Sequence, residues 1–402
     1  MNTEQKRRVL FTASVARHIR AFHLPYLKWF KERGWETWVA AKGEHDGSDA
    51  IPHCDHFVEI SFDRSPFSIK NIRAYSQLRR LTGDVHFDVI HTHTPTASVL
   101  TRLAARNGRL HGVSVLYTAH GFRFYRGASP ITWLLWFPIE RWMSRFTDVL
   151  ITINHEDFAC AKRFAHCRVE YVPGVGIDLK RFSRPFDRDA KRRELDLSPD
   201  EFALLSVGRL IKMKNQEAVV RALPLLPKSV SLVCCGTGGM QDYLQGLAER
   251  LGVSERVRFL GLRKDIPEIV AACDCLVFPS YREGLPVAVM EAMAGGLPVI
   301  ASAIRGVTPD LIINREDGLL LSSITPKAIA AAVQEMLEDE DLRSRLSSCA
   351  MNRVRHFELD AAVKAMASVY SSLYPSLVPE PDDTDHTSGT ARNSATASFE
   401  SR

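Results

Sequence analysis

Two glutamates, Glu283 and Glu291, flank a segment whose pattern predicts a strand, a turn and a helix. The apolar run 275–279 is typical of a buried strand, and Pro286 suits the first position of a helix. The free N–H groups and the dipole of a helix N-terminus favour an anion, while carboxylates accept hydrogen bonds from hydroxyls. The pattern therefore indicates a ligand with both phosphate and hydroxyl groups, such as a nucleotide sugar. The alternative is an ordinary helix start with two solvated glutamates.

Two cations occupy a similar position earlier in the chain. Arg209 and Lys214 lie where the candidate strand 202–207 ends and a helix begins. Two such cations, with the helix dipole, can neutralise a pyrophosphate without a metal ion. The glycine-rich turn 236–239 follows the next strand and permits close approach of the backbone, but its spacing is not that of a P-loop. Solvated cations on a surface loop are the alternative.

Further candidates follow the strands of the first half. The first predicted turn, 14–18, has no glycine, which argues against a dinucleotide site. Its Arg17 and His18 either face a ligand at the carboxyl end of the strand or are solvated. His120 precedes Gly121 at the end of the strand 113–118, where doubly wound sheets place ligands. A turn histidine bonded to backbone is the alternative for His120.

A metal site is not expected from the sequence. His91 and His93 follow the strand 87–90, but no third ligand lies near them in the chain, which favours a packed or hydrogen-bonded pair. Each D-x-D match lies in a polar context rather than after an apolar strand. We therefore predict no metal ligands.

Residues 122–146 combine eight aromatic side chains and four arginines with a single acid, Glu140. Aromatic and basic residues together are typical of a segment that lies at a lipid headgroup interface. The alternative is a core helix, kinked at Pro138, whose arginines extend outward.

Length and composition set the broad class. The chain has 402 residues, 45% hydrophobic and 25% charged, which is ordinary for a globular protein of two or three domains. The formal charge of +5 does not argue for nucleic acid but permits an acidic membrane surface. Eight cysteines without a C-x-x-C pair indicate reduced thiols, as in a cytosol. No apolar run approaches the ~20 residues that span a bilayer.

The elements that position these residues alternate between apolar strands and helical segments in both halves, which predicts parallel α/β sheets. The ordered set of Gly208-Arg209-Leu210 with Lys214, Gly236-Thr237-Gly238, and Glu283 with Glu291 resembles the family-4 retaining glycosyltransferases of the GT-B fold. The segments 22–30, 117–122 and 171–178 resemble the capsule and exopolysaccharide branch of that family.

The resemblance implies two Rossmann-like, doubly wound parallel-sheet domains that face a cleft. The expected division is an N-terminal acceptor-binding domain at 1–178, a linker at 179–199 and a nucleotide-sugar-binding domain at 200–356. A helix at 357–374 would cross back onto the N-terminal domain. The tail 375–402, rich in Pro, Asp, Ser and Thr, is predicted to be disordered.

The resemblance also implies roles for residues. The catalytic set would be His120, Glu283, Arg209 and Lys214, with His120 reaching across the cleft toward the donor sugar. The donor would be bound by Gly208, Arg209, Lys214, Gly236, Gly238, Arg263, Ile266, Glu283, Gly284, Leu285 and Glu291. Arg17 and His18 would lie on the acceptor side. Many family members have a glycine pair in the first turn, where this chain has Ala16-Arg17-His18.

The activity implied is transfer, with retained configuration, from a UDP-sugar to a lipid-linked saccharide in surface polysaccharide synthesis. The donor is a co-substrate, and no cofactor or divalent metal is expected. The protein would be cytoplasmic and would meet the inner membrane through residues 122–146. Two alternatives stay open, a UDP-sugar epimerase of the same fold and a non-catalytic nucleotide-sugar-binding component of a polysaccharide assembly complex.

Overall fold

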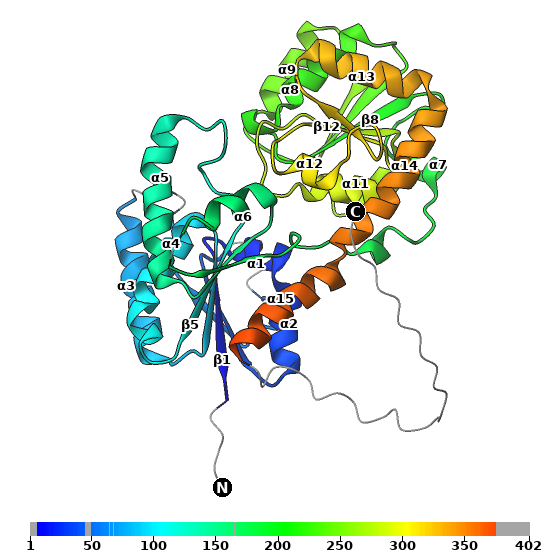
Figure 1. The fold of residues 1–402 in the computed structure, drawn as a ribbon. Helices are drawn as coiled ribbons and strands as arrows, with labels where there is room; N and C mark the ends of the chain where they lie inside the picture. The colour runs from blue at the N-terminus through cyan, green and yellow to red at the C-terminus, as the bar shows by residue number, and fades with distance from the viewer. Residues whose placement is uncertain (1–5, 45–49, 64, 67, 165, 375–402) are drawn as a thin grey trace, which may run out of the picture.

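The computed structural model describes residues 6–44, 50–63, 65–66, 68–164 and 166–374. They form two parallel sheets that lie one above the other, each covered by helices on both faces (Figure 1). The predicted α/β class and the pair of doubly wound sheets are confirmed. The tail 375–402 lies outside the described residues.

The N-terminal sheet has seven strands in the order β3-β2-β1-β4-β5-β6-β7. The core on one face of the sheet includes Val9, Phe11 and Leu116. The core on the other face includes Leu10, Ile90 and Val115. The strands are β1 (Arg8–Thr12), β2 (Glu36–Ala41), β3 (His56–Glu59), β4 (Val89–His93), β5 (Ser114–Ala119), β6 (Val149–Thr152) and β7 (Arg168–Tyr171). The helices are α1 (Ala16–Phe22), α2 (Leu24–Glu32), α3 (Lys70–Asp84), α4 (Pro95–Arg109), α5 (Pro130–Met143) and α6 (His155–Ala161).

The C-terminal sheet has six strands in the order β10-β9-β8-β11-β12-β13. Its strands are β8 (Phe202–Val207), β9 (Val230–Cys235), β10 (Val257–Gly261), β11 (Cys275–Phe278), β12 (Val299–Ser302) and β13 (Leu319–Leu321). Its helices are α8 (Gln216–Ala222), α9 (Gln241–Arg250), α10 (Ile266–Ala272), α11 (Val287–Ala294), α12 (Thr308–Leu311), α13 (Pro326–Glu338) and α14 (Glu340–Val354).

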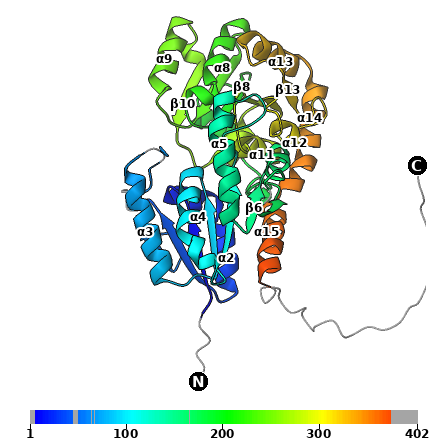
Figure 2. The ribbon, with the colours of Figure 1, turned by 60° about the vertical axis from the view of Figure 1, so that its left-hand side comes forward.

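The last helix returns to the first domain, as expected. Helix α15 (Leu359–Leu373) packs beside α2, and its Met366, Val369 and Tyr370 are buried in the N-terminal core (Figures 1 and 2). The Tyr370 hydroxyl lies 2.7 Å from His91 Nδ1, so His91 has the hydrogen-bonded role predicted for it. This buried contact fastens the C-terminal end of the chain to the N-terminal sheet.

Two segments differ from their predicted form. Residues 179–199, predicted as a linker, contain α7 (Arg188–Glu194), whose Arg192 donates hydrogen bonds to the carbonyls of Ala272, Ser198 and Glu201. The alternating charges of this segment show no apolar periodicity, so the sequence did not predict the short helix. The hydrogen bonds of Arg192 hold the helix against the C-terminal domain. The first turn is also shorter than predicted, because α1 begins at Ala16 and carries Arg17 and His18.

Candidate active site

The two sheets meet through loops that follow β5 and β11. The Arg282 guanidinium donates a hydrogen bond of 2.6 Å to the Phe122 carbonyl. A Cβ atom on Gly284 would lie 2.0 Å from the His120 carbonyl oxygen, and one on Gly121 would lie 3.3 Å from the Gly284 Cα. Only glycine permits such close approach of two backbones. Gly284 thus allows the close contact between the two domains, and it also lies in the turn that leads into α11.

Lys214 and Glu283 form an ion pair at the carboxyl end of the C-terminal sheet. Lys214 ends the short 3-10 helix Lys212–Lys214 after β8, and its Nζ lies 2.6 Å from Glu283 Oε1. The same ammonium lies 5.1 Å from the centroid of the Phe278 ring. Residues 69 apart in sequence are thereby held together where β8 and β11 end.

The backbone beneath these side chains is built from glycines. A Cβ on Gly236, whose φ is +143°, would lie 2.0 Å from the Gly208 carbonyl oxygen, and one on Gly238 would lie 2.2 Å from the Leu210 carbonyl oxygen. Gly208 itself has a φ of +150°, and the methylenes of Lys214 run past it. Because the loops after β8 and β9 touch, a ligand at this edge can approach both of them closely.

Arg209, the second predicted cation, faces the other domain. It lines a cavity of about 560 Å³ together with Arg17 and His18 of α1 and with Arg123. Of the described residues that line this cavity, three are arginines and none is a carboxylate. The start of α4, at residues 94–96, completes one wall. Arg17 lies 3.5 Å from Glu44, so Arg123, Arg209 and the helix N-terminus are the groups that make the cavity suited to an anion.

The other predicted donor residues lie on α10 and α11 or beside them. Glu291 is on the second turn of α11. Burial raises the pKa of its carboxyl, and the opposing effect of Arg181, 3.8 Å away, is smaller. Arg263 is paired with Glu194 and Asp265, so its guanidinium is already engaged.

Two apolar donor candidates are placed by the backbone. Ile266 begins α10. Leu285 lies against Gly174, where an added Cβ would come 2.0 Å from Leu285 Cδ2. The Leu285 side chain therefore belongs to the contact between the domains, and its amide is the group left to meet a ligand.

His120 differs from its predicted orientation. Its ring lies among His18, His23 and His93, with centroid distances of 4.8, 5.4 and 5.6 Å, so it faces the N-terminal domain instead of reaching across the cleft. The backbone carbonyl of His120, rather than its ring, makes the approach to Gly284.

Asp157 holds the loop after β5, and no sequence pattern pointed to it. Its carboxylate accepts hydrogen bonds from the Phe122 N–H at 3.0 Å and from Asn154 Nδ2 at 2.9 Å. It is 4% exposed, and burial raises its pKa to about 6 despite those two bonds. The structural role of Asp157 is seen in its contact with Phe122, which is 35 residues away in the chain. Sequence spacing therefore could not identify Asp157.

Asp157→Asn is expected to stabilise the protein at neutral pH. Because the pKa of Asp157 is raised in the folded state, its ionisation costs nothing below about pH 4 and weakens folding progressively as pH rises from there through 6. A rise of one in pKa corresponds to ~1.4 kcal/mol, so the gain should approach about 2–3 kcal/mol at pH 7.5 and vanish near pH 4. Urea unfolding at both pH values measures the difference. The exposed Asp200→Asn should show none, and an equal effect of Asp157→Asn at both pH values would contradict the assignment.

Comparisons with known proteins give a consistent result. Residues 26–181 match the family model for Glycosyltransferase Family 4, and residues 187–353 match that for Glycosyl transferases group 1. A Bacillus subtilis (strain 168) protein named as putative glycosyltransferase EpsD is 38% identical, over 91% of this chain and 97% of its own. The Escherichia coli UDP-Gal:alpha-D-GlcNAc-diphosphoundecaprenol alpha-1,3-galactosyltransferase is 30% identical, over 75% of this chain and 80% of its own.

Solved structures share the fold at lower identity. Anabaena Alr3699/HepE, solved with UDP and glucose, has a TM-score of 0.75 and 20% identity, covering 91% of this chain and 100% of that one. WaaG, a glycosyltransferase involved in lipopolysaccharide biosynthesis, has a TM-score of 0.72 and 19% identity, over 90% and 99% of the two chains. These likenesses confirm the two-domain arrangement.

Proposed function

This chain belongs to the family-4 glycosyltransferases of the GT-B fold, and we propose that it moves a sugar from a UDP-sugar to a lipid-linked saccharide with retained configuration. The observation that carries the proposal is the Lys214–Glu283 pair at the glycine-lined edge of the C-terminal sheet. The E. coli relative, whose name gives a UDP-linked donor and a diphospholipid acceptor, supports this choice of substrates. The relative EpsD supports a place in exopolysaccharide synthesis.

In the proposed mechanism the leaving group is a nucleoside diphosphate. Lys214 and Arg209 offset the negative charge that grows on it as the glycosidic bond breaks, so the donor needs no divalent metal. Such electrostatic stabilisation is commonly the largest single contribution to catalysis. Glu283, with the amides of Gly284 and Leu285, would position the donor sugar, and Glu291 would accept hydrogen bonds from the ribose. The turn at 263–266 would contact the base.

Retention would follow from attack on the face that the diphosphate leaves. We assign no carboxylate as a nucleophile on the opposite face of the sugar. The leaving phosphate would instead receive the proton of the acceptor hydroxyl. A double displacement would require a covalent glycosyl-enzyme, which mass spectrometry of enzyme incubated with donor alone would detect and which this mechanism excludes.

The acceptor would enter through the basic cavity between the domains. Arg17 and Arg123 contribute positive charge from the N-terminal side, opposite Arg209. A lipid-linked saccharide carries its negative charge on phosphate, so its phosphate groups match these arginines. This match supports an acceptor site on the N-terminal domain and a donor site on the C-terminal domain.

The function is tested by incubating the protein with a panel of UDP-sugars and a lipid-phosphate sugar, followed by mass spectrometry of the lipid product. Transfer of at least one sugar is expected. Interconversion of the donor without an acceptor, followed by NMR, would instead identify an epimerase. Binding of UDP with every donor left intact would identify a non-catalytic component.

We further propose that α5 holds the protein at the cytoplasmic face of the inner membrane. One side of this helix is apolar and exposed, with Ile131, Leu134 and Leu135 at 69, 75 and 51% exposure. The exposed Arg141 and Arg145 lie near its C-terminal end, where they suit anionic headgroups. Among the described residues, no helix is both long and apolar enough to cross a bilayer.

The aromatic residues of this segment are divided between two roles. Trp133 donates a hydrogen bond to the Tyr125 carbonyl, and Trp136 lies under the Arg123 guanidinium, so both belong to the internal packing of the domain. Trp142 is 48% exposed. The aliphatic residues are therefore the better probes of membrane contact.

The triple variant Ile131→Ser, Leu134→Ser, Leu135→Ser should bind anionic liposomes at least tenfold more weakly than the wild type. Each large aliphatic side chain contributes about 1 kcal/mol or more when it leaves water. Sedimentation with phosphatidylglycerol vesicles gives the bound fraction. Leu262→Ser is the matched control, because Leu262 is 80% exposed on the other domain. Equal binding by the triple variant would remove α5 from the proposal.

A further inference from the structure

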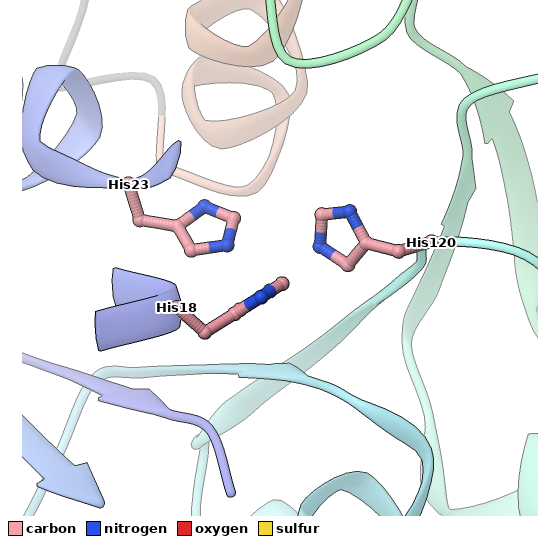
Figure 3. Close-up of side chains that lie close together, drawn as sticks. All are labelled: His18, His23 and His120. Carbon is pink, nitrogen blue, oxygen red and sulfur yellow. The ribbon is translucent and has the colours of Figure 1, made fainter. Parts of the chain in front are cut away.

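Four histidines, His18, His23, His93 and His120, gather inside the N-terminal domain, and His18 among them lines the basic cavity. His18 lies on α1, His23 joins α1 to α2, His93 ends β4 and His120 follows β5. Figure 3 shows the rings of His18, His23 and His120 around one shared space, with nitrogens turned toward it. One ring nitrogen from each of these three lies within 4.8 Å of the other two.

These rings contain buried nitrogen atoms that no described residue satisfies. They are His18 Nε2, both ring nitrogens of His23, and His93 Nε2. His23 and His93 are 1% and 0% exposed, and their rings stack at a centroid distance of 3.6 Å. A buried polar atom without a partner costs roughly 1–3 kcal/mol. Several such atoms around one space indicate that a ligand occupies it.

We propose that His18, His23 and His120 bind a divalent transition-metal cation of the zinc class. Their centroids lie 4.8, 5.1 and 5.4 Å apart, close to the roughly 5 Å spacing expected for imidazoles around tetrahedral zinc with Zn–N bonds of ~2.0 Å. The candidate ligating nitrogens lie within 4.8 Å of one another, and a tetrahedral metal would draw them to roughly 3.4 Å.

The protonation state of the cluster suits a metal. Burial lowers the pKa of His18 to about 4 and that of His23 and His120 well below 6.5. The mutual repulsion of charged imidazoles acts in the same direction on the pKa of His23 and His120. Neutral imidazole, with a free lone pair, is the form that ligates metals.

His93 contacts two members of the trio. Its ring stacks on that of His23 at a centroid distance of 3.6 Å, and its Nδ1 lies 3.4 Å from His120 Nε2. The second contact uses the His120 nitrogen that faces the shared space, so a bound metal would replace it.

Three neutral histidines leave the charge of the cation uncompensated and one tetrahedral position open. His18 is the member of the trio that also lines the cavity, beside Arg17. The open position therefore points to water or to an anionic oxygen from that cavity. Identifying this oxygen with an acceptor phosphate rests on the proposed function, whereas the metal site itself does not. Along the chain, His91 and His93 are close but have no third ligand near them, so the sequence predicts no metal site. The fold brings together a different set of histidines, His18, His23 and His120.

The test uses full-length protein without a histidine tag, stripped with chelator and titrated with CoCl2 and with ZnCl2. The expected result is one equivalent of Co²⁺ bound with the intense visible absorption of a tetrahedral site, which Zn²⁺ displaces. Calorimetry with ZnCl2 should give a micromolar or tighter Kd. His18→Ala and His23→Ala should each weaken binding at least tenfold.

His111→Ala is the matched control, because His111 is exposed and outside the cluster. Circular dichroism of each variant reports folding, and the Co²⁺ spectrum of the wild type needs no variant at all. The proposal would be overturned if Co²⁺ gave no tetrahedral spectrum, or if His18→Ala and His23→Ala left that spectrum unchanged. In either case the space between the rings would be assigned to water. Transfer from UDP-sugars is assayed separately, so a missing metal and a missing transferase activity are distinguishable.

Discussion

Lys214→Ala is expected to lower kcat for sugar transfer by about 10²–10³, the effect of removing one preorganised charge from a developing oxyanion. Its Nζ lies 2.6 Å from Glu283 and is held over the Phe278 ring, so little reorganisation is needed when the diphosphate leaves. Without Lys214, Arg209 alone would offset the charge. UDP release measured at saturating donor and acceptor gives kcat directly.

Lys212→Ala is the control for this prediction. Lys212 belongs to the same 3-10 helix and is exposed, and its side chain lines a different pocket, beside Glu217 and Tyr281. Its replacement should leave kcat within about twofold of the wild type. Glu283→Ala should also reduce turnover, since it frees Lys214 and removes a contact proposed for the donor sugar. Unchanged turnover in both Lys214→Ala and Glu283→Ala would refute the assigned donor site.

The parts of the site that the sequence predicts are those encoded by local chemistry. Gly208, Gly236 and Gly238 lie in short turns between apolar strands, and turns of this kind are readable from residue type alone. The parallel order of the strands places such turns at the same edge of the sheet. The sequence places Lys214 and Glu283 at this edge but does not predict their ion pair, because the pair depends on how the loops after β8 and β11 meet.

The parts that sequence could not predict depend on contacts between distant segments. His23 lies between α1, which the sequence does not predict, and α2, so its approach to His120 has no local signal. The ring of His120 packs against His18 and His23 while its backbone carbonyl meets Gly284, and both contacts join segments far apart in the sequence. Trp133 and Trp136 face inward although their neighbours are exposed, since helix periodicity alone does not identify the buried side of an apolar segment.

Glu140→Ala is expected to destabilise the protein by about 3–5 kcal/mol, the usual cost of removing one partner from a buried ion pair. Glu140 lies on the inner side of α5 at 6% exposure, and its Oε2 accepts a 2.9 Å hydrogen bond from Arg102 of α4, which is 1% exposed. Arg102 also bonds Ser98 and lies over the Tyr117 ring, so it cannot move into solvent without breaking both contacts. For a domain of this size, Tm should fall by roughly 6–20 °C.

The double variant Arg102→Met, Glu140→Leu measures what the ion pair as a whole contributes to the free energy of unfolding. Glu140→Ala instead measures the cost of leaving Arg102 buried without its partner. Apolar replacements of similar volume commonly restore the stability of a buried pair, so this variant should unfold within about 1–2 kcal/mol of the wild type. If it does, the pair contributes little net stability, and the cost of Glu140→Ala comes from leaving the Arg102 charge buried without its partner. A Glu140→Ala variant as stable as the wild type would show that Arg102 finds another acceptor, and that α5 is attached by its apolar contacts alone.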